Sequence, residues 1–304
     1  MPGPDGQVHR GWRRQTRWAL ESSWGELPAE PEWLSVPIQD GAMGLATTVL
    51  PYEAPGLYGG LKRTVLLREG LAAAGRVVTL AWPQVTEYLL DAALARVADP
   101  ESADYQDLSS YSVDFYTPSD PRRFSGAVVE ELELRAEPRA AAFALTLRAW
   151  KEESNAGLSA NDFDYAALSP APFRLRGAQV SINTVAVADV EAFTLTVRSD
   201  VREGPSAGGL PAFLIAGRRT VRLDLAKLDA SSVFGDALRD GTTLSFAASF
   251  SHPEGHTLTL SAPALHAAQS EELAPPERVA RVRPRLVAAT DGAGCDVSYE
   301  VFLS

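Results

Sequence analysis

The sequence predicts a mainly β protein made of two copies of one unit, a β-sandwich with a single helix over one face. Apolar and polar residues alternate in many short stretches, such as Phe193–Val197, which is the pattern of a half-buried strand. Helical spacing of apolar residues is clear in Thr86–Val97, and Ser231–Leu238 is a second candidate helix. Ala-Gly-Arg occurs around Gly75 and again, 142 residues later, around Gly217, with the same order of predicted elements on both sides. We therefore expect an internal duplication.

The composition narrows the possible functions. A length of 304 residues is sufficient for two domains or for one duplicated domain. A net charge of −11 argues against tight binding of nucleic acid through its phosphates, although it does not exclude a surface that nucleic acid slides past. Cys295 is the only cysteine, so the chain can form neither an internal disulfide nor a cysteine zinc site. No apolar run reaches the ~18 residues of a membrane span, and no apolar core of a secretory signal follows the N-terminus, so a cytoplasmic origin is expected.

Residues 1–34 are predicted to be an irregular N-terminal arm. Four of the six tryptophans lie there: Trp12, Trp18, Trp24 and Trp33. Their rings either dock on their own domain or contact a neighbouring subunit, and both interpretations stay open at this point. Residues 35–59 are predicted to be a long loop or extended hairpin with a possible strand at Leu45–Leu50. Contacts between subunits are expected from both segments, and deletion of residues 1–34 is expected to leave a folded monomer.

The first repeat is assigned to residues 60–150. Its helix, Thr86–Val97, is ended by Asp99-Pro100. The strands predicted around that helix are Arg63–Leu67, Val77–Trp82, Tyr111–Tyr116, Val128–Ala136 and Phe143–Trp150.

A polar linker, residues 151–172, separates the halves, and residues 173–304 form the second repeat with the C-terminal strands. The strands predicted in this half are Gln179–Val185, Ala192–Ser199, Arg219–Leu225, Thr243–Phe250, Thr257–Pro263, Arg285–Ala289 and Cys295–Phe302.

We find no set of residues that predicts catalysis, a cofactor or a metal. His252 and His256 have a spacing of four, but the Pro253-Glu254-Gly255 turn between them predicts two exposed turn residues, and no cysteine or third histidine lies at useful spacing. The adjacent carboxylates Glu130 and Glu131 point to opposite faces of a strand and cannot share a substrate. Motifs for a serine nucleophile, a phosphate loop or a dinucleotide are absent from the sequence. The chain is therefore expected to be a non-enzyme.

Several segments together resemble the tail tube proteins of siphovirus-like bacteriophages, which have long non-contractile tails. The resemblance covers about 270 residues and consists of order and spacing rather than one signature motif. The segments that carry it are Trp24-Gly25-Glu26, Leu34-Ser35-Val36-Pro37, Phe124-Ser125-Gly126 leading into VVEELELRAE, Pro172-Phe173, VEAFTLTVRSD followed by AGRRTVRLDL, and LTLSAPAL.

The resemblance implies a tail-tube-type β-sandwich or barrel and a structural role in the virion tail. It implies rings that stack into a hollow tube for DNA ejection, with three duplicated subunits giving pseudo-sixfold symmetry. The implied neighbours are other copies of the chain, the tape measure protein and tail-terminator or tail-tip proteins, with double-stranded DNA passing without specific binding and no membrane. Synthesis would take place in the host cytoplasm. The alternative is a virion-associated or adhesion β-sandwich of the carbohydrate-binding type, which would gather exposed aromatic residues at one loop end.

Alternation in Val128–Ala136 places Glu131 and Glu133 on the face opposite Leu132 and Leu134. Two interpretations stay open: the charged row faces solvent outside the sandwich, or it lines the channel beside the threonine row of Thr194 and Thr196. In the second case we expect a negative potential that repels the phosphates of passing DNA.

Overall fold

The computed structural model describes most of the chain. The described residues are 14–54, 63–94, 109–188, 190–203, 214–227, 236–237, 239–273, 281–288 and 297–303. Trp12, the C-terminal end of the predicted helix Thr86–Val97 and most of Ser231–Leu238 lie outside them. Within the described part, no helix is both long enough and apolar enough to cross a membrane.

The fold is mainly β, as predicted, and the strands of the described ranges fall into two sets of eight. The first set comprises β1 (Gln15–Leu20), β2 (Leu34–Val36), β3 (Asp40–Ala54), β4 (Arg63–Leu80), β5 (Tyr111–Tyr116), β6 (Arg122–Ala136), β7 (Ala141–Ala149) and β8 (Lys151–Ser154). The second comprises β9 (Gln179–Ile182), β10 (Val185–Ala186), β11 (Val190–Glu203), β12 (Leu214–Lys227), β13 (Thr243–Ser251), β14 (Thr257–Leu273), β15 (Arg281–Ala288) and β16 (Ser298–Phe302).

The hydrogen-bonded pairings show the duplication directly. In the first half β1 pairs with β2 and β5, β3 with β4, β4 with β7, and β6 with β5, β7 and β8, all antiparallel. The second half repeats this scheme when eight is added to each strand number. Among the described residues one further pairing, β6 with β11, joins the halves. The sequence therefore encodes the same two-sheet unit twice.

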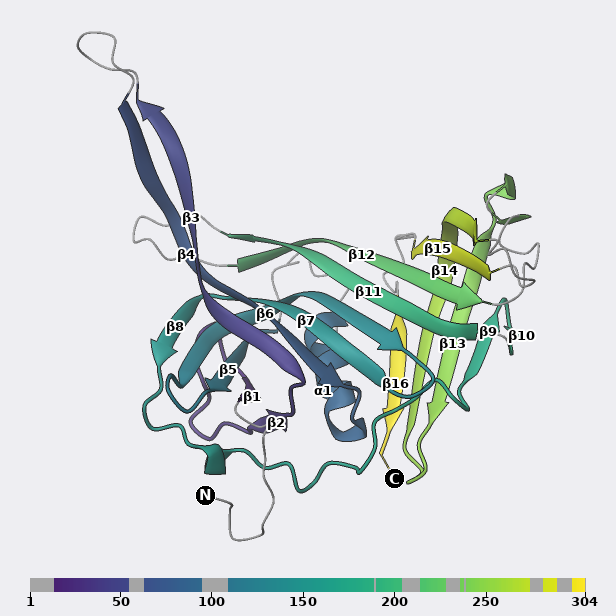
Figure 1. The fold of residues 1–304 in the computed structure, drawn as a ribbon, viewed down its shortest axis with the longest axis horizontal. Coiled ribbons are helices and arrows are strands. Elements are labelled where there is room, and N and C mark those ends of the chain that lie inside the picture. The colour runs from purple at the N-terminus through teal and green to yellow at the C-terminus, as the bar shows by residue number, and fades with distance from the viewer. Residues whose placement is uncertain are drawn as a thin grey trace.

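Each unit consists of a hairpin sheet and a cover sheet. The hairpin sheet of the first unit has the order β3-β4-β7-β6 and that of the second β11-β12-β15-β14, so the β6–β11 pairing makes them continuous. The cover sheets contain β2, β1, β5 and β8 in one unit and β10, β9, β13 and β16 in the other, each paired onto the N-terminal part of β6 or β14. Figure 1 shows the β3–β4 hairpin projecting well beyond the rest of the molecule.

The Ala-Gly-Arg tripeptides that suggested the repeat do not occupy equivalent positions. Gly75 lies mid-sheet, opposite Met43 of β3 and Leu147 of β7. Gly217 lies instead in the bulge of the β11–β12 hairpin, between the pairs formed by Arg219 and Ala216. Superposing Gly75 on Gly217, as the shared tripeptide would suggest, is therefore wrong in register, because a three-residue match does not determine which residues pair.

One continuous core joins the two units. Among its largest fully buried side chains are Trp18, Phe124, Phe143, Phe173, Phe193, Phe246 and Phe250. The helix α1 (Pro83–Leu94) contributes Leu89 and Leu90, both fully buried, and contacts β6 and β16. It begins three residues before the predicted start, because proline is well tolerated in the first turn of a helix. In the second unit, residues 236–237 and 239–240 are helical at the corresponding place in the chain order.

Two segments that were predicted to be irregular contain regular structure. The N-terminal segment includes β1, which pairs with β5 over its whole length, and β2, which pairs with β1. The linker begins with β8 and contains the single-turn helix η1 (Ala160–Asp162). We did not predict β1, β2 and β8 because they are short and their apolar and polar residues do not alternate clearly.

Candidate functional site

One face of the continuous hairpin sheet carries the residues predicted to line a channel. On β6, Leu132 and Leu134 are fully buried in the core, and Glu131 and Glu133 point the opposite way. On β11 the buried residues are Phe193, Leu195 and Val197, and Thr194, Thr196 and Arg198 lie on the other side. The alternation that was read from the sequence is therefore present on both strands.

The strand register brings the four predicted residues into one patch. Across the β6–β11 pair, Thr196 lies opposite Glu133 and Arg198 lies opposite Glu131. Glu131, Glu133, Thr194 and Thr196 line a shallow depression, together with Arg198, Thr220, Arg222 and Asp224 from β11 and β12. We call these eight residues the charged sheet face.

The carboxylates of this face have arginine neighbours. The Glu133 carboxylate lies 2.8 Å from Arg135 Nε and 3.6 Å from Arg76 Nη2. Glu131 lies 3.9 Å from Arg198 Nε. Asp224 lies 2.6 Å from Arg222 Nη2. Three carboxylates thus face four guanidinium groups, so the row of uncompensated negative charge that we expected is replaced by a nearly balanced one. Arg76 and Arg198 come from neighbouring strands, so the sequence gives no local sign of their pairing. Arg135 and Arg222 lie two residues from Glu133 and Asp224 on the same strand, so alternation already places each pair on one face.

The three described tryptophans of the N-terminal segment pack largely within their own subunit. Trp18 is fully buried, so it docks on its own domain and offers no surface to a neighbour. Trp24 packs against Trp150 with ring centroids 5.1 Å apart. The Trp33 ring lies 4.4 Å below the Arg17 guanidinium carbon and 5.1 Å from that of Arg123. Trp24 and Trp33 both keep part of their surface exposed.

A buried carboxylate, Glu21, holds the N-terminal segment to the first unit. It accepts hydrogen bonds from Gly25 N at 2.7 Å, from Gly126 N at 2.8 Å and from Ser112 Oγ at 2.7 Å. Gly25 has a φ of 77°, and a Cβ there would lie 2.6 Å from the Trp150 ring, so only glycine fits. The Trp-Gly-Glu and Phe-Ser-Gly motifs of the sequence therefore meet at this point.

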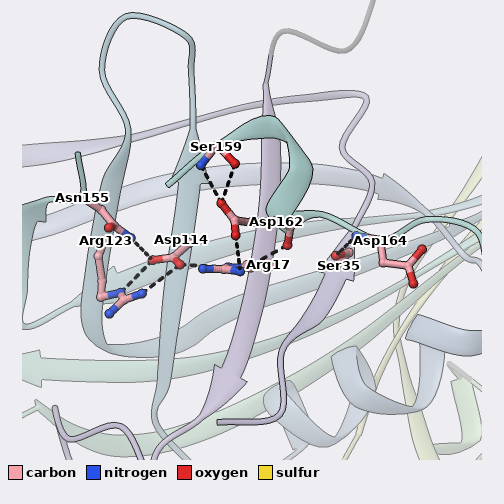
Figure 2. A network of polar contacts seen from close by, with 8 residues as sticks. All are labelled: Arg17, Ser35, Asp114, Arg123, Asn155, Ser159, Asp162 and Asp164. Atoms are coloured by element: carbon pink, nitrogen blue, oxygen red, sulfur yellow. Dashed lines mark hydrogen bonds and ion pairs between the residues drawn. The ribbon is translucent and has the colours of Figure 1, made fainter. Parts of the chain in front are cut away.

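A second buried carboxylate, Asp114 of β5, is the centre of a polar network (Figure 2). It is fully buried and lies 3.0 Å from Arg17 Nε and 2.7 Å from Arg123 Nε. Asn155 Nδ2 donates a further hydrogen bond to it at 3.2 Å. Arg17 also donates to the Asp162 carbonyl oxygen at 3.2 Å. The network therefore connects β1, β5, β6 and the linker, which is a structural rather than a chemical role.

The linker is fixed by further hydrogen bonds in the same region. The Asp162 carboxylate accepts hydrogen bonds from Ser159 N and Ser159 Oγ, which lower the pKa of this carboxyl group. Asp164 N donates to Ser35 Oγ at 2.9 Å, and Figure 2 shows this contact beside the Asp114 network. The linker therefore lies along β1 and β2 instead of passing freely between the units.

The two histidines of the β13–β14 turn are not exposed, contrary to the prediction. His252 and His256 are both buried, with 6% and 7% of their surface accessible. Residues 253–255 do form the predicted turn, and their conformation stacks the two imidazole rings 5.3 Å apart. The burial comes from the linker, which lies over the turn: His252 Nε2 is 2.9 Å from the Ala171 carbonyl oxygen. Sequence alone did not predict which distant segment covers a turn.

Comparison with protein families identifies a match over most of the chain. A family model described as "Phage tail tube protein" matches residues 11–284. No curated protein matches the chain. The matched range includes the charged sheet face, the Glu21 and Asp114 contacts and the β13–β14 turn.

Proposed function

The chain belongs to the phage tail tube protein family, and we therefore propose that copies of it assemble into stacked rings. These rings would form the channel for DNA ejection. Family membership supports a structural role in the virion tail. We propose a long non-contractile tail, synthesis in the host cytoplasm, and contacts with the tape measure protein and with tail-terminator or tail-tip proteins. DNA would pass without specific binding.

We propose that each ring contains three chains. The two units of the chain have the same strands and the same pairings, so three chains would supply six similar units around one axis. Such a ring would have pseudo-sixfold symmetry, with the linker and the β6–β11 pairing joining the two units of each chain.

A single observation carries the ring proposal: the β6–β11 pairing has no counterpart elsewhere within the described part of the chain. Residues 131–136 of β6 pair with residues 193–198 of β11. The strand equivalent to β6 in the second unit is β14, and the strand equivalent to β11 in the first unit is β3. The C-terminal part of β14, beyond the residues that pair with β13, is paired only with β15 in the described part. In the same way, β3 is paired only with β4. Two unpaired edges of this kind are a template for pairing between chains.

We propose that these two edges pair with each other in neighbouring subunits. Both long hairpins carry a bulge, after Thr47 in β3 and after Ser199 in β11. Residues 193–198 of β11, which end one residue before Ser199, pair with β6. The corresponding segment of β3 ends one residue before Thr47 and comprises residues 41–46. Its partner on the next subunit would be residues 267–273 of β14. The hairpin sheets would then form one closed barrel, which has no free edge.

Cysteine cross-linking tests this arrangement. In a Cys295→Ser background, Ala46→Cys would be combined with one cysteine at a time at Gln269, Ser270, Glu271 or Glu272. A disulfide forms only where Cα atoms lie within about 7 Å. We expect one or two of these pairs to give covalent dimers and trimers on denaturing gels under oxidising conditions.

Each cysteine alone is the control and should give no ladder that ends at three chains. A ladder that passes three chains would contradict the trimeric ring while leaving edge pairing intact. Rings seen by electron microscopy in which none of the pairs cross-links would contradict the proposed edges.

The same arrangement would place the charged sheet face toward the channel. In the sandwich, the opposite face of this sheet packs into the core, so one face remains for the inside of a closed barrel. Glu131, Glu133, Thr194 and Thr196 would then line the lumen with their arginine partners. A polar wall with nearly balanced charge would neither hold phosphates strongly nor repel them strongly.

We propose that the β3–β4 hairpin and the N-terminal segment contact other subunits. The hairpin projects from the sandwich (Figure 1), which allows it to reach an adjacent ring. Of the tryptophans, Trp24 and Trp33 retain surface for such contacts. The carbohydrate-binding alternative needs a group of exposed aromatic rings at one loop end, but each of the five tryptophans in the described part is at least partly buried.

A further inference from the structure

The β13–β14 turn brings three potential metal ligands together. His252 and His256 flank the turn, and backbone hydrogen bonds hold it: His252 N donates to the His256 carbonyl oxygen and Gly255 N donates to the His252 carbonyl oxygen, each at 2.9 Å. Glu254, at the tip, directs its carboxylate to both rings. Oε2 lies 3.8 Å from His252 Nδ1 and 3.5 Å from His256 Nε2. The three ligand atoms all lie within 4.8 Å of one another.

We propose that His252, Glu254 and His256 bind a divalent transition metal ion, with zinc as the ion that fits best. Zinc lies about 2.0–2.2 Å from imidazole nitrogen and carboxylate oxygen, so two of its ligand atoms in a tetrahedral site are roughly 3.3–3.5 Å apart. The observed distances to the Glu254 oxygen are close to this spacing. Two histidines and a glutamate leave one position for water, which is a common zinc ligand set.

The surroundings orient the His252 imidazole for this role. His252 Nε2 is 2.9 Å from the Ala171 carbonyl oxygen, so Nε2 carries the proton and Nδ1 presents its lone pair toward Glu254. A second hydrogen bond to a backbone carbonyl is the usual support of a zinc-binding histidine. That lone pair accepts a hydrogen bond of 3.2 Å from Glu254 N, which the metal would replace. The sequence offers no cysteine or third histidine at useful spacing, and the third ligand is instead Glu254, within the turn itself.

The second imidazole differs, because its metal-facing nitrogen already has a hydrogen-bond partner. His256 Nε2, the atom that faces Glu254, lies 3.2 Å from Ser169 Oγ, and the metal would replace this contact. Gln84 of α1 holds this serine through two hydrogen bonds, Gln84 Nε2 to Ser169 Oγ at 2.8 Å and Ser169 N to Gln84 Oε1 at 3.0 Å. The Glu254 side chain is 43% exposed and the histidines are nearly enclosed, so an ion could enter from the Glu254 side. A bound metal would fasten the turn beneath the linker and α1.

Zinc titration of the full chain tests the site. Isothermal titration calorimetry with zinc chloride should give one equivalent of tight binding, and zinc should raise the melting temperature by mass action. Glu254→Gln keeps the size and hydrogen-bonding capacity of a half-exposed turn residue, so this variant should fold normally. Its zinc affinity should fall by at least the roughly 10–100-fold that loss of a supporting contact causes. His252→Gln and His256→Gln should bind no stoichiometric zinc.

The matched control is His9→Gln with His266→Gln, which removes the two histidines outside the cluster. His266 is exposed on β14. The control should bind zinc as the unmodified chain does. Absence of stoichiometric zinc binding by the unmodified chain would overturn the proposal. So would equal zinc affinity in the unmodified chain and in folded Glu254→Gln, and the circular dichroism spectrum of that variant reports whether it has folded.

Discussion

At the scale of single residues, the most constrained polar group of the first unit is Asp114. Its side chain is fully buried, and its charge is compensated by Arg17 and Arg123, which keep 15% and 27% of their side-chain surface exposed. Burial of an unpaired charge is costly, whereas a paired and hydrogen-bonded one is tolerated. Asp114 therefore requires residues from β1 and β6 to be in place at the same time.

We predict that Asp114→Ala lowers the free energy of unfolding by about 3 kcal/mol, near the lower end of the range for breaking a buried pair, because both arginines retain some solvent. Urea unfolding followed by circular dichroism measures the change. Asp120→Ala is the control, since Asp120 and its partner Arg122 are both exposed. Its cost should be at most about 1 kcal/mol. Equal losses in the two variants would show that Asp114 has no special role.

At the scale of secondary-structure elements, the N-terminal segment is part of the folded unit. β1 lies between β2 and β5, it carries the fully buried Trp18, and Glu21 follows it directly. The expectation that removal of residues 1–34 leaves a folded monomer does not agree with this packing, because the deletion would uncover the core.

We predict that a chain lacking residues 1–34 is unfolded or aggregated at a temperature where the full chain is stable. Loss of a buried aromatic side chain alone costs roughly 3–5 kcal/mol, a large part of the ~5–15 kcal/mol that stabilises a typical domain. A chain lacking residues 1–13, which retains β1, is the control and should keep the melting temperature of the full chain. Thermal unfolding measures both. A cooperative transition at the normal temperature in the longer deletion would refute the prediction.

At the scale of the whole molecule, the duplicated sandwich determines where charge can act. In the proposed ring, the charged sheet face would recur around the channel and along the tail. Each carboxylate has an arginine neighbour, so replacing glutamates by lysines would leave Arg76, Arg135 and Arg198 without compensation as well as adding positive charge. The wall would then attract phosphates.

We predict that Glu131→Lys with Glu133→Lys allows tubes to form but slows DNA ejection from assembled phage. The defect should ease as salt increases, because salt screens the added attraction. Release of DNA after receptor triggering, followed by fluorescence of a DNA-binding dye at two salt concentrations, measures this.

Glu137→Lys with Glu153→Lys makes the same change in charge at two exposed positions outside the charged sheet face and should leave the ejection rate unaltered. If both double variants eject DNA at the normal rate in low salt, the charged sheet face does not line the channel.

Patterns in the sequence were sufficient to predict the class of fold, the duplication and the family. Alternation in β6 and β11 reports which side of each strand is buried, and this is a local property of the chain. The same alternation correctly placed Glu131, Glu133, Thr194 and Thr196 on the face away from the core. The order of motifs such as Trp-Gly-Glu and Phe-Ser-Gly carried the resemblance that the family match supports.

Which segments become partners depends on the tertiary structure. Arg198 beside Glu131, Arg76 beside Glu133, the linker over His252 and the docking of Trp18 all involve residues far apart in the chain. The register of the two hairpins, which separates Gly75 from Gly217, also depends on pairing across strands. The local alternation of apolar and polar residues predicts whether a side chain is buried. Which residues that side chain contacts is determined by how the strands of both units pack together.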